Sequence, residues 1–168
     1  MKKNRIVILV LSDSHGSTPN IREALKRCRP IDAVIFLGDG VGDLYSIASS
    51  CDSFAWLAVR GNCDYRDDTL LGRELPKVGE ITLLGKRIVF THGDVYGVKF
   101  GMDGLFALAE ERKADVVLYG HTHRAKEEYL GGVYYFNPGS VGATYGEHPT
   151  AGVLTIEEGA VLFSFLNL

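Results

Sequence analysis

The chain has 168 residues, of which 46% are hydrophobic and 23% are charged. That length fits roughly one domain, residues 1–168, and the composition excludes a disordered or fibrous chain. Eighteen Lys and Arg against 21 Asp and Glu give a formal charge of -3, so the chain has no basic surplus for a dedicated nucleic-acid surface or an anionic membrane. Three cysteines without a Cys-x-x-Cys pair, no full signal peptide and no transmembrane-length run favour a cytoplasmic protein.

The first sixty residues alternate between short apolar runs and segments of helical periodicity. The apolar runs are rich in Val and Ile and end in polar or Gly-rich turns, so they predict buried strands. The strands span residues 6–11, 33–37 and 54–59, and the helical segments between them span residues 21–29 and 44–50. This β-α-β-α-β order predicts a parallel sheet.

The rest of the chain predicts a mixed sheet. Residues 80–84 and 87–91 indicate a hairpin, residues 102–112 have the apolar spacing of a helix, and residues 115–119 form another buried strand. Three further strands are expected to pair in antiparallel fashion; they span residues 133–136, 152–156 and 160–166.

Four of the five histidines follow predicted strands within a few residues. Loops at the strand ends of an open α/β sheet are where ligands bind, so several strands bring imidazoles toward what we interpret as one crevice. The loop segments are Ser12-Asp13-Ser14-His15, Gly38-Asp39-Gly40, Gly61-Asn62-Cys63-Asp64, Thr91-His92-Gly93-Asp94 and Gly120-His121-Thr122-His123. Residues 12–15 by themselves also fit a helix cap and residues 38–40 a turn, but five such segments at one sheet edge favour a shared metal site.

Seven side chains in these segments are candidate metal ligands: Asp13, His15, Asp39, Asn62, His92, His121 and His123. A single catalytic zinc takes about three protein ligands, so seven candidates indicate two metals that share a carboxylate. Nitrogen and oxygen donors without thiolate suit Mn, Fe, Zn, Ni or Co. We therefore expect two divalent metal ions as cofactors, with manganese as the first choice.

From Asp13 to His123 these segments resemble the ordered motifs of the calcineurin-like metallophosphoesterases, which are Asp-x-His, Gly-Asp, Gly-Asn, His and Gly-His-x-His. The later segment Asn137-Pro138-Gly139-Ser140 is typical of the small prokaryotic phosphodiesterase branch. The resemblance implies an α/β fold of two stacked mixed β-sheets flanked by helices, a four-layer αββα sandwich. It also implies a hydrolase that cleaves a phosphate ester, and specifically a phosphodiester, by in-line attack of a hydroxide bridging two divalent metals.

The resemblance assigns roles to individual residues. It implies that Asp13, His15 and His123 hold one metal, that Asn62, His92 and His121 hold the other, and that Asp39 bridges the two. Asp39, Asn62 and His121 are then the catalytic candidates. Asn62 and His121 are also our candidates for contacting substrate oxygens beside the second metal.

Cys63 departs from the pattern of many phosphatases of this family, in which a His after the Asn can protonate the leaving group. Nearby cations would lower the pKa of the Cys63 thiol and make it a poorer acid, so we expect Cys63, although a catalytic candidate by position, not to be an essential general acid. Asp64 is expected to brace its loop and Asp94 to orient His92. His148 lies outside the motifs and is expected in a surface loop.

Four functions are alternatives to a metal-dependent phosphodiesterase. A dinucleotide-binding turn at residues 38–43 would place Asp39 against a pyrophosphate of like charge, and an aspartyl-nucleophile phosphatase would have Asp at the position of His15. A non-catalytic scaffold resembling the retromer coat subunit would be marked by lost metal ligands, whereas all seven are present. A phosphomonoesterase stays as an alternative. The expected partner is a phosphate-ester substrate, with no nucleic acid and no membrane; a homo-oligomer is left open.

Overall fold

The computed structural model describes residues 4–50, 53–65, 69–70, 72–142 and 148–168. The strands of one sheet are β1 (Arg5–Leu11), β2 (Ala33–Phe36), β3 (Ala55–Ala58), β11 (Thr150–Glu157) and β12 (Ala160–Asn167). Those of the other are β6 (Val78–Leu83), β7 (Lys86–Thr91), β8 (Val116–Tyr119), β9 (Ala125–Leu130) and β10 (Val133–Pro138). The remaining elements are α1 (Thr18–Arg27), α2 (Val41–Ala48), α3 (Asp103–Arg112), the 3-10 turn η1 (Asp94–Tyr96) and the short pair β4 (Thr69–Leu70) and β5 (Arg73–Glu74).

Both large sheets are mixed. Their strand orders are β12-β11-β1-β2-β3 and β6-β7-β8-β10-β9. β1, β2 and β3 run parallel, as the β-α-β-α-β order predicts, and β7, β8 and β10 run parallel in the second sheet. The carboxyl ends of these parallel strands carry the loops in which the sequence predicts metal ligands.

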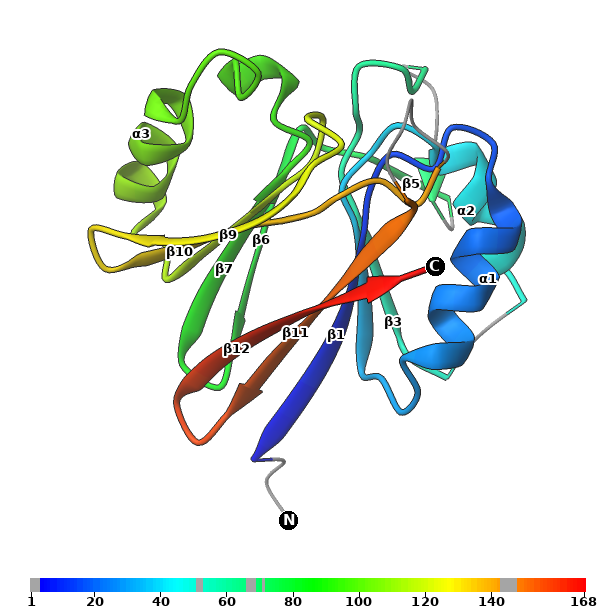
Figure 1. Ribbon diagram of the computed structural model, residues 1–168, viewed down its shortest axis with the longest axis horizontal. Coiled ribbons are helices and arrows are strands. Elements are labelled where there is room, and N and C mark those ends of the chain that lie inside the picture. The colour runs from blue at the N-terminus through cyan, green and yellow to red at the C-terminus, as the bar shows by residue number, and fades with distance from the viewer. Residues whose placement is uncertain (1–3, 51–52, 66–68, 71, 143–147) are drawn as a thin grey trace.

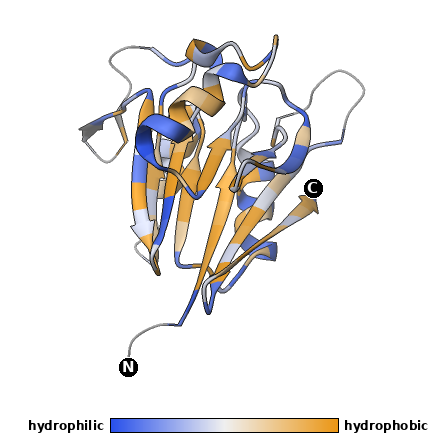
Figure 2. Ribbon diagram, turned by 90° about the vertical axis from the view of Figure 1, so that its left-hand side faces the viewer, coloured by the Kyte–Doolittle hydropathy of each residue, from blue (hydrophilic) through white to orange (hydrophobic). Residues whose placement is uncertain are grey.

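The two sheets pack face to face, with α1 and α2 outside the first and α3 outside the second (Figure 1). Side chains of β1 show how the sequence builds these layers, because alternate strand residues point to opposite faces. Ile8 and Val10 lie in the core between the sheets, whereas Leu9 and Leu11 pack against the helices. Figure 2 shows the hydrophobic colouring along these central strands. The expected four-layer αββα sandwich is confirmed.

Four elements differ from what the sequence predicts. α1 and α2 each begin three residues earlier than predicted; Pro19 occupies the first turn of α1, where a missing N–H costs nothing. β9 was not predicted, because this edge strand is largely exposed and polar. β10 pairs in parallel with β8, not only in antiparallel fashion with β9. None of the described helices combines the length and the apolar character needed to cross a membrane.

Candidate metal centre

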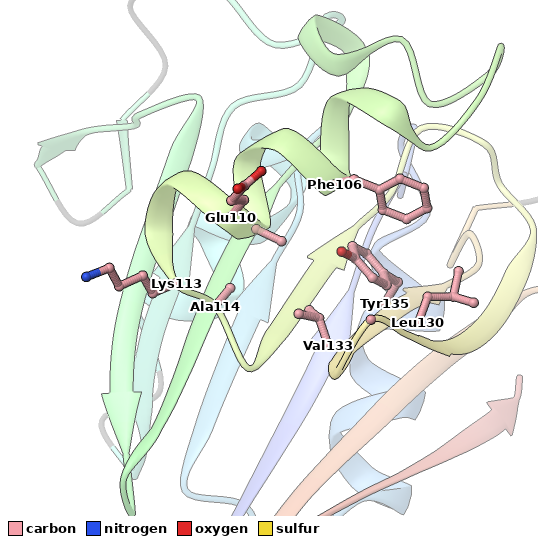
Figure 3. A pocket seen from close by; sticks show the side chains of 9 residues that line it. Phe106, Glu110, Lys113, Ala114, Leu130, Val133 and Tyr135 are labelled. Atoms are coloured by element: carbon pink, nitrogen blue, oxygen red, sulfur yellow. The ribbon is translucent and has the colours of Figure 1, made fainter.

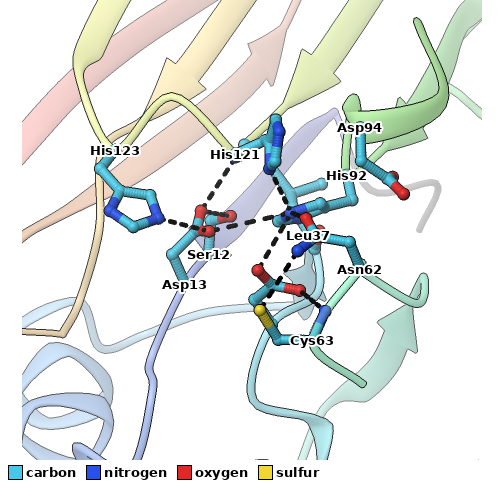
Figure 4. Close-up of polar contacts among 12 residues, drawn as sticks. Ser12, Asp13, Leu37, Asn62, Cys63, His92, Asp94, His121 and His123 are labelled. Atoms are coloured by element: carbon cyan, nitrogen blue, oxygen red, sulfur yellow. Dashed lines mark hydrogen bonds and ion pairs between the residues drawn. The ribbon is translucent and has the colours of Figure 1, made fainter. Parts of the chain in front are cut away.

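The structure brings all seven predicted ligands together where the loops after β1, β2, β3, β7 and β8 meet. Figure 4 shows Asp13, Asn62, His92, His121 and His123 among them. One group of ligand atoms surrounds Asp13 Oδ1. His123 Nε2 lies 3.0 Å from this oxygen, and His15 Nε2 lies 3.8 Å from it. The two imidazole Nε2 atoms are 3.4 Å apart. Three donors from two loops thus face a common point.

A second group surrounds His92 Nε2. This nitrogen lies 3.2 Å from Asn62 Oδ1, 3.1 Å from His121 Nδ1 and 3.3 Å from Asp39 Oδ2. The same Asp39 oxygen lies 3.9 Å from His15 Nε2, which belongs to the first group. The Asp39 carboxylate therefore stands between the two groups.

The donors of both groups fit divalent cations. Asp13 Oδ1 is buried and accepts no hydrogen bond, although imidazole nitrogens lie close to it. Such an orphaned carboxylate oxygen is costly unless a cation satisfies it. Ligand atoms about 2.1 Å from a metal lie roughly 3 to 3.4 Å from one another, and the shorter distances within each group fall in this range. The donor set matches a nitrogen- and oxygen-ligated metal centre.

The backbone of the ligand loops is strained. Five of the seven ligand residues have left-handed φ angles; these are Asp13 (55°), His15 (42°), Asp39 (59°), His121 (66°) and His123 (60°). Each such residue costs about 1 to 3 kcal/mol and persists only where its surroundings enforce it. Five of the eight described non-glycine residues with positive φ are candidate ligands, which indicates that the loops are shaped to aim side chains at the centre.

The two carboxylates are held ionised. Burial by itself would raise the pKa of Asp13, but His123, His15 and His92 outweigh it and hold that pKa well below its usual range. Burial opposes ionisation of Asp39 as well, yet His92 and the Cys63 backbone N–H lower the Asp39 pKa to about 2. Two buried negative charges therefore face the histidines, which is the electrostatic condition for attracting cations.

The imidazoles respond to these carboxylates in different ways. The nearby Asp13 carboxylate raises the pKa of His15. Burial alone would lower the pKa of His92, but Asp39 and Asp13 raise it. Burial, the His92 charge and the Lys99 charge lower the pKa of His121. His121 therefore gives up its proton more readily than His15 or His92 and can act as a neutral nitrogen donor.

A backbone carbonyl, not Asp94, orients His92. Asp94 is the residue expected in this role from the sequence, but the Nδ1 of His92 lies 2.8 Å from the Leu37 carbonyl oxygen, and Nε2 is left facing the centre. Asp94 instead accepts a hydrogen bond from Lys77 Nζ at 3.0 Å, and Lys77 also donates to the Gly61 carbonyl at 3.0 Å. Through Lys77, Asp94 ties its loop to the one that carries Asn62.

Asp64 holds two ligand loops together. Its carboxylate accepts hydrogen bonds of 2.8 to 2.9 Å from the backbone N–H groups of Asp39, Gly40, Val41 and Gly61. The first three belong to the loop after β2, and Gly61 belongs to the loop after β3. The structure thus places Asp64 as a brace between the Asp39 and Asn62 loops.

Asp64→Ala is expected to lower the free energy of unfolding of the metal-free protein by about 3 kcal/mol, because four backbone donors lose their acceptor. Urea denaturation followed by circular dichroism measures this change. Asp64→Asn keeps one acceptor oxygen and should lose less than the Ala variant. A loss below about 0.5 kcal/mol in Asp64→Ala would contradict the bracing role.

Sequence reasoning missed residues that support the centre from behind. The side chain of Asn137 donates to the Gly120 carbonyl (2.9 Å) and to Thr122 Oγ1 (3.0 Å), which fixes the turn that carries two histidines. Ser140 Oγ donates to the Asp13 carbonyl at 2.7 Å. The segment 137–140 contains both residues, but in the sequence it served only as a mark of resemblance and received no role.

Cys63 and His148, which the sequence also singles out, lie at or outside the edge of the centre. Cys63 is exposed, and its Sγ accepts a hydrogen bond from Asn62 Nδ2 at 3.2 Å. Desolvation and the carboxylates of Asp39 and Asp64 raise the pKa of Cys63 to about 11, so the metal-free thiol keeps its proton at neutral pH. His148 is exposed, whereas the neighbouring residues 143–147 lie outside the described residues.

Two pockets flank the second sheet. One, of about 750 Å³, is lined by residues 98–102 and by Thr122, Arg124 and Lys126 among others, beside the turn that carries His121 and His123. The other, of about 560 Å³, lies between α3 and the β9–β10 hairpin and has mainly apolar walls that include Phe106 and Tyr135 (Figure 3). The second contains no residue of the ligand loops, so only the first adjoins the metal centre.

Comparisons with known proteins agree with this geometry. A family profile described as "Calcineurin-like phosphoesterase superfamily domain" matches residues 6–159. Phosphodiesterase YfcE of Escherichia coli (strain K12) is 32% identical over 161 residues, covering 86% of this chain and 84% of that protein. Vacuolar protein sorting-associated protein 29 of Schizosaccharomyces pombe is 34% identical over 141 residues, covering 80% of this chain and 72% of that protein. A crystal structure from Streptococcus pneumoniae, titled as a predicted phosphoesterase, superposes with a TM-score of 0.80 at 26% identity, covering 98% of this chain and 91% of that one.

Proposed function

The chain belongs to the calcineurin-like phosphoesterase superfamily, and from this we propose that it is a metal-dependent phosphodiesterase that uses two divalent cations. The observation that carries the proposal is the position of Asp39, whose Oδ2 lies 3.9 Å from His15 Nε2 in one ligand group and 3.3 Å from His92 Nε2 in the other. A carboxylate between two sets of donors is what a pair of neighbouring cations requires. The phosphodiesterase YfcE, 32% identical to this chain, supports diesters as the substrate class.

In the proposed centre Asp13, His15 and His123 hold one cation, Asn62, His92 and His121 hold the other, and Asp39 contacts both. When bound, two divalent cations supply hydroxide near neutral pH and offset the negative charge of the phosphoryl group. The chain's own task is then to position groups, since phosphoryl transfer needs little covalent chemistry from the protein. Manganese is our first choice, with iron, zinc, nickel or cobalt as alternatives.

Asn62 and His121 are the proposed contacts to the substrate. Asn62 is exposed at the mouth of the centre, and its Nδ2 can turn from Cys63 toward a phosphoryl oxygen. His121 is partly exposed and has a lowered pKa, so it reaches the substrate as a neutral imidazole. In the overall reaction the oxygen of water forms a bond to phosphorus, the bond from phosphorus to the ester oxygen breaks, and that oxygen takes a proton.

A non-catalytic metal-binding scaffold is the second candidate, because vacuolar protein sorting-associated protein 29 is among the relatives. Its name describes a sorting protein and does not name an ester substrate. The complete donor set and the orphaned buried oxygen of Asp13 support metal binding, which both candidates require, so hydrolysis of an ester distinguishes the enzyme from the scaffold.

Hydrolysis of a matched pair of esters tests the proposal. With manganese present, a phosphodiesterase should hydrolyse bis(p-nitrophenyl) phosphate with a kcat/KM at least about tenfold above that for p-nitrophenyl phosphate. A reversed ratio would identify a phosphomonoesterase. Metal binding without hydrolysis of either ester would favour the scaffold.

A further inference from the structure

The pocket beside the metal centre is basic, although the chain as a whole is not. Three of the side chains that line its roughly 750 Å³ are Lys99, Arg124 and Lys126, and none of its described lining residues is acidic. The whole chain carries a formal charge of -3. A local cluster of cations in an acidic protein marks a place where negative charge can be bound.

This pocket is connected to the ligand turn. Thr122 lines the pocket and stands between His121 and His123 in the chain. The hydrogen bond from Asn137 to Thr122 Oγ1, at 3.0 Å, fixes the wall that the pocket shares with the centre. A substrate held at the metals can therefore extend into the pocket.

Residues 98–102, which line the pocket, include apolar and aromatic side chains. Phe100 lines the pocket and is 97% exposed, which is unusual for so large an apolar side chain, and Met102 stands near it in the chain. An exposed aromatic face beside cations suits a nucleobase attached to phosphates, because bases stack on aromatic rings and phosphates bind Lys and Arg. By contrast, the pocket in Figure 3 has one Lys and one Glu in mainly apolar walls.

We propose that this pocket selects small nucleotide phosphodiesters that carry a second phosphate, with Lys99 binding that phosphate and Phe100 contacting the base. The proposal rests on the phosphodiesterase function and names its substrate class. Three basic residues suffice for one additional phosphate but not for the run of phosphates in a nucleic-acid polymer. Lys99 is the residue to substitute, because Lys126 already pairs with Glu128 at 2.9 Å and Arg124 is next to the candidate ligand His123 in the chain.

Two substrates that differ only in the second phosphate test the proposal. Thymidine 5'-(p-nitrophenyl phosphate) and its 3'-phosphorylated form have the same scissile bond and the same leaving group. We expect kcat/KM to be roughly tenfold higher for the phosphorylated form, as one charge-assisted contact gives. This ratio should fall as salt is added, because the contact is exposed to solvent.

Substitutions test whether the preference for the 3'-phosphorylated nucleotide arises in the pocket. Lys99→Gln should reduce the ratio by roughly fivefold or more. Phe100→Ala should lower kcat/KM for both nucleotides alike and leave their ratio unchanged. Lys26→Gln removes the same charge from α1, away from the pocket, and should change neither value. Calorimetry provides a readout apart from turnover: the wild-type protein should bind thymidine 3',5'-bisphosphate more tightly than thymidine 5'-monophosphate, and Lys99→Gln should abolish the difference.

The outcomes separate this inference from the proposed function. Hydrolysis of bis(p-nitrophenyl) phosphate with equal kcat/KM for the two nucleotides would overturn the pocket proposal and leave the phosphodiesterase intact. An unchanged ratio in Lys99→Gln would also overturn it. If no ester is hydrolysed, the phosphodiesterase function fails, and equal calorimetric affinities for the two thymidine phosphates would then overturn the binding pocket as well.

Discussion

Removal of divalent cations is expected to abolish hydrolysis of bis(p-nitrophenyl) phosphate, with a loss of at least about 10³-fold in kcat that added manganese restores. No nucleophilic side chain needs to replace the cations in this proposal, so the metal-free chain should keep its fold and lose its activity. Treatment with EDTA, gel filtration and assay with each divalent metal in turn measure the effect.

Elemental analysis of the reconstituted protein makes the same prediction quantitative. Asp39 lies between two groups of ligand atoms, so saturation should require two ions per chain. Circular dichroism before and after chelation controls for unfolding. At most one bound metal at saturation, together with no activity after manganese is added, would contradict the dinuclear centre.

The second large effect is expected from Asp39→Asn, which should reduce kcat by about 10³-fold, whereas Asn62→Ala should reduce it by roughly 10- to 100-fold. Asp39 is the carboxylate proposed to contact both cations, and Asn62 contacts one. The substitution keeps the side-chain oxygen that accepts the Cys63 backbone N–H at 2.7 Å, so the loop should retain its shape.

A matched control separates a lost ligand from a lost negative charge. Asp103→Asn removes the same charge from the exposed start of α3 and should leave kcat unchanged. Urea denaturation should give all three variants a free energy of unfolding within about 1 kcal/mol of the wild type. Equal and slight losses of activity in Asp39→Asn and Asn62→Ala would remove Asp39 from the bridging position.

Local sequence patterns were sufficient for the strands that build the two central layers. Runs such as residues 6–11 and 116–119 are short and apolar throughout, which is typical of strands with both faces buried. β9 gave no such signal, since its side chains are mainly solvated and its place is fixed by backbone pairing with β10. The pairing of β10 with β8 depends on contacts between distant segments, which periodicity does not encode.

The candidate ligands were likewise readable from the sequence. Each ligand follows a parallel strand, and the carboxyl ends of such strands meet at one edge of a sheet, so residue type and position predicted a common site for Asp13, His92 and the others. What the spacing left open is which donors face one another, because two sheets contribute loops and their stacking sets the distances.

Only the tertiary structure decided how the ligands are held. A backbone carbonyl leaves no mark in a sequence, so the hydrogen bond of His92 to Leu37 could not be foreseen, and Asp94 was assigned that role instead. The bracing role of Asp64 also depends on the tertiary structure, because its four backbone partners come from two loops. So does the basic pocket, which Lys99 and Arg124 line although they are 25 positions apart in the sequence. The sequence determined the kinds of ligand and the order of the strands that carry them, whereas the stacking of the two sheets decided their geometry, their supports and the neighbouring pocket.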